Sequence, residues 1–112
     1  MFSFQKLVVY QKSLDLSVSL TKVASGFPFS FSRIRDQLIG AVTSITLNIA
    51  EGCGRSGNKE KMQFFKIARG SAFELVSIVE ICEKINLITK DDYLAEIESI
   101  CKMLNGLINK YK

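Results

Sequence analysis

The polar residues of this sequence that could do chemistry lie in the middle of the chain. Asn48 and Glu51 are three residues apart, so a helix would place them on one face, and Glu74 could join them from a later segment. A carboxylate beside an amide can take part in acid–base chemistry. The chain has, however, no histidine, no activated nucleophile pattern and no metal-ligand spacing. We therefore expect no catalytic residue, no metal, no cofactor and no enzymatic activity.

The same polar residues have a structural interpretation. Glu51 precedes Arg55 by four residues, the spacing of an ion pair along a helix. An amide such as Asn48 beside an apolar stripe can fix the register between two helices. We expect a polar seam between helices, and its members are Gln37, Asn48, Glu51, Ser71 and Glu74.

Basic residues suggest a second kind of site. Residues 33–69 carry seven Lys or Arg against three acidic residues, whereas residues 70–112 carry five against seven. Such side chains can bind phosphate backbones without reading base sequence. A basic face that is merely solvated is an equally good interpretation. The candidate nucleic-acid-binding residues are Arg33, Arg35, Arg55, Lys59, Lys61, Lys66 and Arg69.

The composition indicates one soluble domain over residues 1–112. Hydrophobic residues make up 47% of the 112 residues and charged residues 23%, which excludes a disordered chain. The three cysteines form no Cys-x-x-Cys pair, so a reducing cytoplasm is the expected location. The chain opens with no secretory signal pattern and contains no apolar run of about 18 residues, so we expect no membrane association.

Four segments with apolar residues at steps of three and four must position these side chains. The first spans about residues 4–23, and short connections join each segment to the next. The sequence predicts an all-α, antiparallel up-down-up-down four-helix bundle. Phe27, Phe29 and Phe31 are expected to close one end of it. Gly70 is expected to let its helix cross closely against Gly40.

Helix boundaries follow from capping residues. Ser30 or Ser32 could cap the second helix, Ser56 or Asn58 the third, and Thr89 the fourth, while Asn86 would end the third.

The second and third helices carry more apolar residues than one bundle usually buries. The third could be the innermost helix, or a second copy could cover the surplus. Association with a foreign helix is a further alternative. The residues expected at an oligomer interface are Ile39, Leu47, Phe65, Val76 and Val79.

Residues 37–52 include the sequence Asn-Ile-Ala-Glu-Gly, and Phe64-Phe65, Gly70-Ser71 and Glu74-Leu75 follow at set distances. Together with residues 4–12 and the Phe27-Pro28 corner, this pattern resembles the 23S rRNA intervening-sequence proteins. The resemblance implies a left-handed antiparallel bundle and a homopentameric ring. It also implies kinship with the accessory proteins of diversity-generating retroelements, which assist a reverse transcriptase and contact nucleic acid.

The chain departs from that family where members commonly have two basic residues, here Ile39 and Gly40, and where proline often occurs near Thr46. The first departure weakens the nucleic-acid interpretation. We expect a non-catalytic, homopentameric bundle that acts as an adaptor or binds RNA, DNA or a nucleic-acid-processing protein weakly. The alternative is a purely structural oligomer that binds no nucleic acid.

Overall fold

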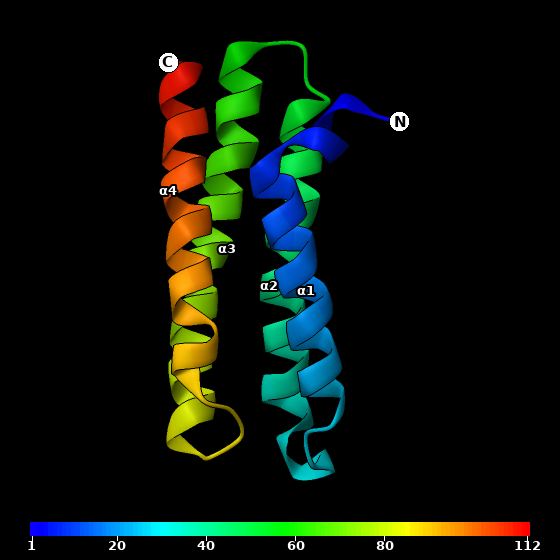
Figure 1. The fold of residues 1–112 in the computed structure, drawn as a ribbon, viewed down its shortest axis with the longest axis vertical. Helices are drawn as coiled ribbons and strands as arrows, with labels where there is room; N and C mark the ends of the chain where they lie inside the picture. The colour runs from blue at the N-terminus through cyan, green and yellow to red at the C-terminus, as the bar shows by residue number, and fades with distance from the viewer.

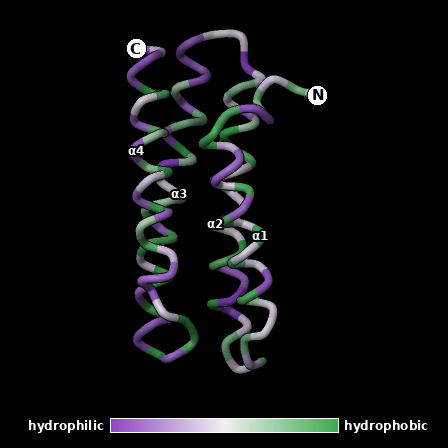
Figure 2. The backbone as a smooth tube through the Cα atoms, in the orientation of Figure 1, coloured by the Kyte–Doolittle hydropathy of each residue, from purple (hydrophilic) through white to green (hydrophobic).

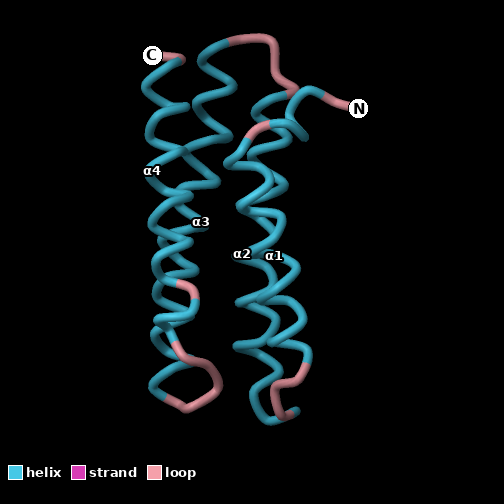
Figure 3. The backbone as a smooth tube through the Cα atoms, in the orientation of Figure 1, coloured by secondary structure: helices cyan, strands magenta, loops and turns pink.

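The computed structural model describes residues 1–112, and helices and loops account for the whole chain (Figures 1 and 3). Its principal dimensions are 44 × 24 × 20 Å. The predicted antiparallel four-helix bundle is confirmed. The long helices are α1 (Val8–Ser25), α2 (Ser32–Cys53), α3 (Asn58–Lys84) and α4 (Leu94–Lys110), and short 3-10 turns are η1 (Ser3–Lys6), η2 (Phe29–Phe31) and η3 (Lys90–Asp92).

The four helices pack in the order in which they occur in the chain. Each helix contacts the next one, with the most extensive contact between α2 and α3, and α1 also contacts α4. The pair α1 and α2 therefore forms the side opposite the pair α3 and α4 (Figure 1). Short connections force each helix to run back along its predecessor.

Apolar residues recur every three or four positions along each long helix, so each helix has an apolar side (Figure 2). These sides meet in one hydrophobic core to which all four helices contribute. The largest fully buried side chains include Leu20, Leu38, Ile45, Ile49, Phe65, Leu75, Ile97, Ile100 and Leu104.

Two of the predicted interface residues are core residues. Phe65 and Val79 are buried within the single chain, so the prediction that they lie at an oligomer interface is wrong. The physical reason is that α3 packs against both α2 and α4 and needs two apolar lines to do so. Ile39 and Val76 are half-buried and pack against the same core. Leu47 remains on the surface, 67% exposed.

A polar pair lies between α1 and α2 inside the apolar packing. The Ser17 hydroxyl donates to the backbone carbonyl of Val42 over 2.9 Å, and it also lies 2.9 Å from the Thr46 hydroxyl. Both side chains are buried. Each hydroxyl has a partner, which removes most of the cost of burying it. The sequence does not reveal this pair, because a serine at a core position cannot be told from any other small residue by helical periodicity.

The helices begin without the predicted side-chain caps. Phe31, Gly57 and Tyr93 precede α2, α3 and α4, and none of them accepts a capping hydrogen bond through its side chain. The 3-10 turns η2 and η3 lead directly into α2 and α4 with backbone bonds of their own. The first helix likewise begins later than predicted, at Val8, after η1. The caps predicted at Ser30 or Ser32, at Ser56 or Asn58, and at Thr89 are therefore wrong.

The C-terminus of α3 matches its prediction. Asn86 has a left-handed backbone with φ of 62°. Its N–H donates to the Glu83 carbonyl over 2.9 Å, and the Leu87 N–H donates to the Cys82 carbonyl over 2.8 Å. This pair of bonds is the Schellman motif, in which Asn or Gly ends a helix. The Glu83 carboxylate also accepts a hydrogen bond from the Lys90 N–H over 3.1 Å and so holds the following loop.

The close approach of α2 and α3 occurs at a different glycine from the predicted one. A Cβ added at Gly40 or Gly70 would meet no atom within 4 Å, so the predicted crossing there is wrong. A Cβ at Gly52 would lie 2.7 Å from Cε1 of Phe65 and 3.2 Å from Cβ of Phe64. Only glycine fits between the helices at position 52 without displacing them.

The three phenylalanines between α1 and α2 do not act together. Phe27 is buried, Phe31 is half-buried, and Phe29 is 87% exposed. The prediction that all three close the end of the bundle is therefore wrong for Phe29. The turn η2 directs successive residues to different sides, whereas an extended segment would have placed Phe27 and Phe29 on one side.

Candidate nucleic-acid interface

One residue of the predicted polar seam, Ser71, joins α3 to α2 through a hydrogen bond with Ser44. The hydroxyls of Ser44 and Ser71 lie 2.8 Å apart, and the Asn48 amide donates to the Ser44 carbonyl over 2.8 Å. Gln37 and Glu74 are exposed and form no hydrogen bond or ion pair. The Ser44–Ser71 pair thus connects the two helices, whereas both hydrogen bonds of the Asn48 amide stay within α2. No carboxylate lies within hydrogen-bond distance of Asn48 to act as an acid or base with it.

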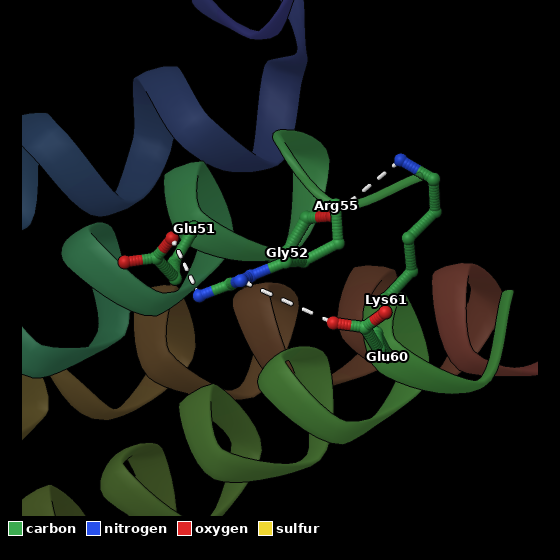
Figure 4. A network of polar contacts seen from close by, with 5 residues as sticks. All are labelled: Glu51, Gly52, Arg55, Glu60 and Lys61. Carbon is green, nitrogen blue, oxygen red and sulfur yellow. Dashed lines mark hydrogen bonds and ion pairs between the residues drawn. The ribbon is translucent and has the colours of Figure 1, made fainter. Parts of the chain in front are cut away.

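Arg55 fastens the connection between α2 and α3 (Figure 4). Its guanidinium lies 3.2 Å from the Glu51 carboxylate, as the four-residue spacing predicts, and 4.0 Å from the Glu60 carboxylate. It also lies over the Phe64 ring, 4.8 Å from the centroid. Two carboxylates and an aromatic ring therefore surround this cation, so little of its charge is free for a ligand. The Arg55 Nε is buried without a hydrogen-bond partner.

The Lys61 side chain contacts the C-terminal end of α2 (Figure 4). Its ammonium donates to the Cys53 carbonyl over 3.1 Å and lies 3.5 Å from the Gly52 carbonyl. Carbonyls at a helix C-terminus have no partner within the helix and carry partial negative charge, so a cation there stabilises the helix. Two predicted nucleic-acid-binding residues, Arg55 and Lys61, thus have structural contacts.

The glycine-rich sequence of this connection, Gly52-x-Gly54-x-x-Gly57, also matches the spacing of a dinucleotide-binding turn. That function requires a preceding strand and a helix that opens on the pyrophosphate. Here a helix precedes the turn, and Gly52 packs against an aromatic ring. The geometry excludes the dinucleotide interpretation.

The remaining predicted basic residues do not gather on one face. Arg33 and Arg35 lie at the start of α2, the end of the molecule opposite Lys59. Arg35 pairs with the Asp36 carboxylate over 3.0 Å. Arg69 donates to the side-chain carbonyl of Asn105 over 2.8 Å and so joins α3 to α4. Of the seven predicted residues, three are exposed cations without a carboxylate partner: Arg33, Lys59 and Lys66.

The positive charge of the molecule gathers at one end of the bundle. We call this the basic end: residues 1–7, 50–63 and 107–112. Both termini and the connection from α2 to α3 lie there (Figure 1). These segments carry six Lys or Arg against two carboxylates, and the nine basic and nine acidic side chains elsewhere cancel. The net charge of +4 for the whole chain therefore resides at this end.

Side chains from all three segments of the basic end line one shallow pocket of about 240 Å³. Four lysines of these segments are exposed and have no carboxylate partner, and they are Lys6, Lys59, Lys110 and Lys112. Of these four lysines, only Lys59 was among the residues predicted to bind nucleic acid. The predicted fold could have indicated the other three lysines, because an up-down-up-down bundle places both termini and its middle connection at the same end. The pocket is lined by Ser3, Phe4, Leu7, Cys53, Lys61 and Tyr111.

The three cysteines are free thiols. Burial raises the pKa of Cys53, Cys82 and Cys101 above the ordinary value of 9.0. Lys61 opposes this increase in pKa at Cys53, and Arg69 opposes it at Cys101. A thiol with a raised pKa is protonated at neutral pH and is a poor nucleophile. Cys82 lies in the hydrophobic core and Cys53 and Cys101 pack against it, so the thiols act as packing groups.

Two further classes of site find no support in the structure. No group of three or more Cys, Asp or Glu side chains is placed to hold a metal ion. None of the helices combines the length and the apolar character that crossing a lipid bilayer would require.

The fold and these contacts define an all-α four-helix-bundle protein in which several polar side chains join helices and the net charge gathers at one end. The chain belongs to the 23S rRNA-intervening sequence protein family, whose model matches residues 5–106. The resemblance noted in the sequence is thereby confirmed.

A solved structure with the same fold comes from Bacteroides thetaiotaomicron, a protein described as of unknown function from the S23 ribosomal protein family. The two structures superpose with a TM-score of 0.82 at 23% sequence identity. The match covers 91% of this chain and 96% of that one. No curated protein matches the chain.

Proposed function

We propose that this protein is a non-catalytic module that self-associates and binds nucleic acid weakly through its basic end. The observation that carries the proposal is that four exposed lysines without carboxylate partners gather where the whole net charge resides. Neutralising a phosphate releases bound counterions, so binding is favourable at low salt and falls as salt rises. Lysine contacts of this kind position a phosphate backbone without reading its bases.

Two exposed apolar surfaces support self-association. One lies on α1 and α2, where Val18 and Thr43 line a groove and Leu14 and Leu47 are exposed one helical turn further along. The other is a groove of about 280 Å³ between α3 and α4, where Phe73 is 58% exposed. A contact between two different surfaces on opposite sides of a subunit can close into a ring.

Five is the number of subunits that family resemblance implies, and we propose a homopentamer in the cytoplasm. The three unpaired thiols support a reducing compartment. In a closed ring, symmetry would bring each lysine cluster to an equivalent position, so the basic ends would form one multivalent surface.

A binding isotherm tests the proposal. Fluorescence anisotropy of a labelled RNA oligonucleotide, measured at low salt, should rise with protein concentration, and the apparent affinity should fall as salt is added. The variant Lys59→Gln/Lys112→Gln should bind more weakly. The matched control Lys22→Gln/Lys84→Gln removes two exposed, unpaired lysines from the opposite end and should bind like the wild type. If neither RNA nor DNA binds the protein at low salt, the proposed function is contradicted.

A purely structural oligomer is the second candidate. The exposure of Leu47 and Phe73 favours it, because both residues would be covered in an assembly whether or not nucleic acid binds. An oligomer that binds neither RNA nor DNA in the same titration would support this candidate.

A further inference from the structure

The basic end also presents an aromatic surface. The ring of Phe2 is stacked on that of Phe4, with centroids 5.9 Å apart and an angle of 15° between the ring planes. The rings of Phe4 and Tyr10 form a T-shaped pair, with centroids 5.0 Å apart and an angle of 73° between the ring planes. Phe2 is nevertheless 72% exposed, so it is covered on the side of Phe4 and open elsewhere.

Hydrogen bonds hold this N-terminal segment in place. The backbone N–H of Phe2 donates to the side-chain oxygen of Gln5 over 2.7 Å. The Gln11 side chain donates to the Gln5 carbonyl over 3.0 Å and ties η1 to α1. The backbone that carries the Phe2 ring is therefore held before any ligand arrives, and a backbone already in place loses little conformational entropy on binding.

Lysines occur on the same segments as the aromatic step formed by Phe2 and Phe4. Lys6 lies in the same 3-10 turn, and the pocket beside Phe4 is also lined by Lys61 and Tyr111. The Lys110 ammonium lies 5.4 Å from the centroid of the Tyr111 ring. Exposed rings interleaved with lysines are the arrangement that binds bases by stacking and phosphates by charge.

We propose that the basic end binds single-stranded nucleic acid, with a base stacked on Phe2 and phosphates held by Lys6, Lys59, Lys110 and Lys112. This inference rests on the proposed function and narrows it to one strand form and one location. Bases inside a duplex are already stacked and paired, so they cannot lie on the Phe2 ring. Stacking is tolerant of sequence, because every base has an aromatic face.

The experiment compares labelled oligothymidylate with a duplex of equal length, measured by anisotropy with the full chain. The wild type should bind the single strand about tenfold more tightly than the duplex, the effect expected of one stacked base. Phe2→Ala should remove that preference and leave duplex binding unchanged. The matched control is Phe29→Ala, which removes an exposed phenylalanine from the opposite end and should change neither affinity.

The salt dependence of the affinity tests which lysines contact the phosphates. The variant Lys59→Gln/Lys112→Gln should reduce the slope of log affinity against log salt by about 1.4 for the single strand. The pair Lys22→Gln/Lys84→Gln should leave the slope unchanged. Circular dichroism would verify that each variant is folded.

The outcomes separate this inference from the proposed function. Equal affinity for single strand and duplex, or a Phe2→Ala variant that binds the single strand as the wild type does, would overturn the inference and leave the proposed function standing. A reduced slope in the Lys22/Lys84 variant instead of the Lys59/Lys112 variant would overturn the location. Failure of both ligands to bind at low salt would overturn the proposed function together with the inference.

Discussion

At the scale of single residues, the buried hydroxyl pair between α1 and α2 should make a measurable contribution to stability. Ser17→Ala would leave the Thr46 hydroxyl buried without its partner, which lies 2.9 Å away in the wild type. We expect the free energy of unfolding to fall by about 1–3 kcal/mol, the cost of a buried polar group left unpaired. Urea denaturation followed by circular dichroism measures the change.

A double-mutant cycle distinguishes the lost hydrogen bond from lost packing. Thr46→Val removes the other hydroxyl and keeps the shape of the side chain. If the pair matters as a hydrogen bond, Ser17→Ala/Thr46→Val should be less destabilised than the sum of the two single variants. Additive effects would contradict this account.

The buried thiols predict how stability depends on pH. Because burial raises the pKa of Cys82 above 9.0, the folded chain keeps this proton at a pH where the unfolded chain loses it. The stabilisation is complete below about pH 9, and it is lost as pH rises from there through the pKa of the folded state. Burial raises the pKa of Tyr93 above 10.0 as well, which acts in the same direction.

Urea denaturation in the presence of reductant, from neutral to alkaline pH, measures this effect. The wild type should lose stability as pH rises above about 9. Cys82→Ala should be less stable than the wild type at neutral pH but should lose less stability on the alkaline side. Parallel pH profiles for the two proteins would refute the assignment to Cys82.

At the scale of elements, Gly52 decides how closely α2 and α3 can approach. An alanine Cβ there would lie 2.7 Å from the Phe65 ring, and this ring is buried with its centroid 6.0 Å from that of Tyr111. Because the ring is confined, Gly52→Ala should force the helices apart and lower the free energy of unfolding by about 1–3 kcal/mol. Thermal or urea denaturation measures the loss.

The matched control is Gly70→Ala, which lies in the same helix pair but faces open space. Alanine favours the helical backbone over glycine, so this variant should be more stable than the wild type by up to about 1 kcal/mol. A destabilised Gly70→Ala variant, or a neutral Gly52→Ala variant, would show that the closest approach has been misplaced.

The elements also show which features of the fold are readable from sequence. Helical periodicity predicted all four long helices, because each must turn an apolar side to one core. The helix starts were missed, because the turns η2 and η3 and their backbone bonds, rather than side-chain caps, lead into α2 and α4. Phe65 and Val79 were misassigned to an interface for a related reason. An apolar line on a helix does not say whether its own chain or a second copy covers it.

At the scale of the whole molecule, the candidate site depends on topology more than on local sequence. Lys6 and Lys112 are as far apart in the chain as two lysines can be, yet both belong to the basic end. Arg55 and Lys61 looked equally suitable for nucleic-acid binding from sequence. In the folded chain, two carboxylates pair with Arg55, and Lys61 binds the C-terminal carbonyls of α2. Charge alone could not identify which cations are free, because that depends on neighbours brought together by folding.

The exposed apolar surfaces predict the behaviour of the whole molecule in solution. Leu47 lies on the α1–α2 side, 67% exposed, where a second copy would cover it. If the protein self-associates through this side, Leu47→Asp would place a charge in the contact, and desolvating that charge is costly. Sedimentation velocity should then show an assembly for the wild type and a monomer for Leu47→Asp. The control Phe29→Asp adds the same charge at an exposed position outside the grooves and should sediment like the wild type. A monomeric wild type, or an equal effect of both variants, would mean that the α1–α2 side is no contact surface between copies.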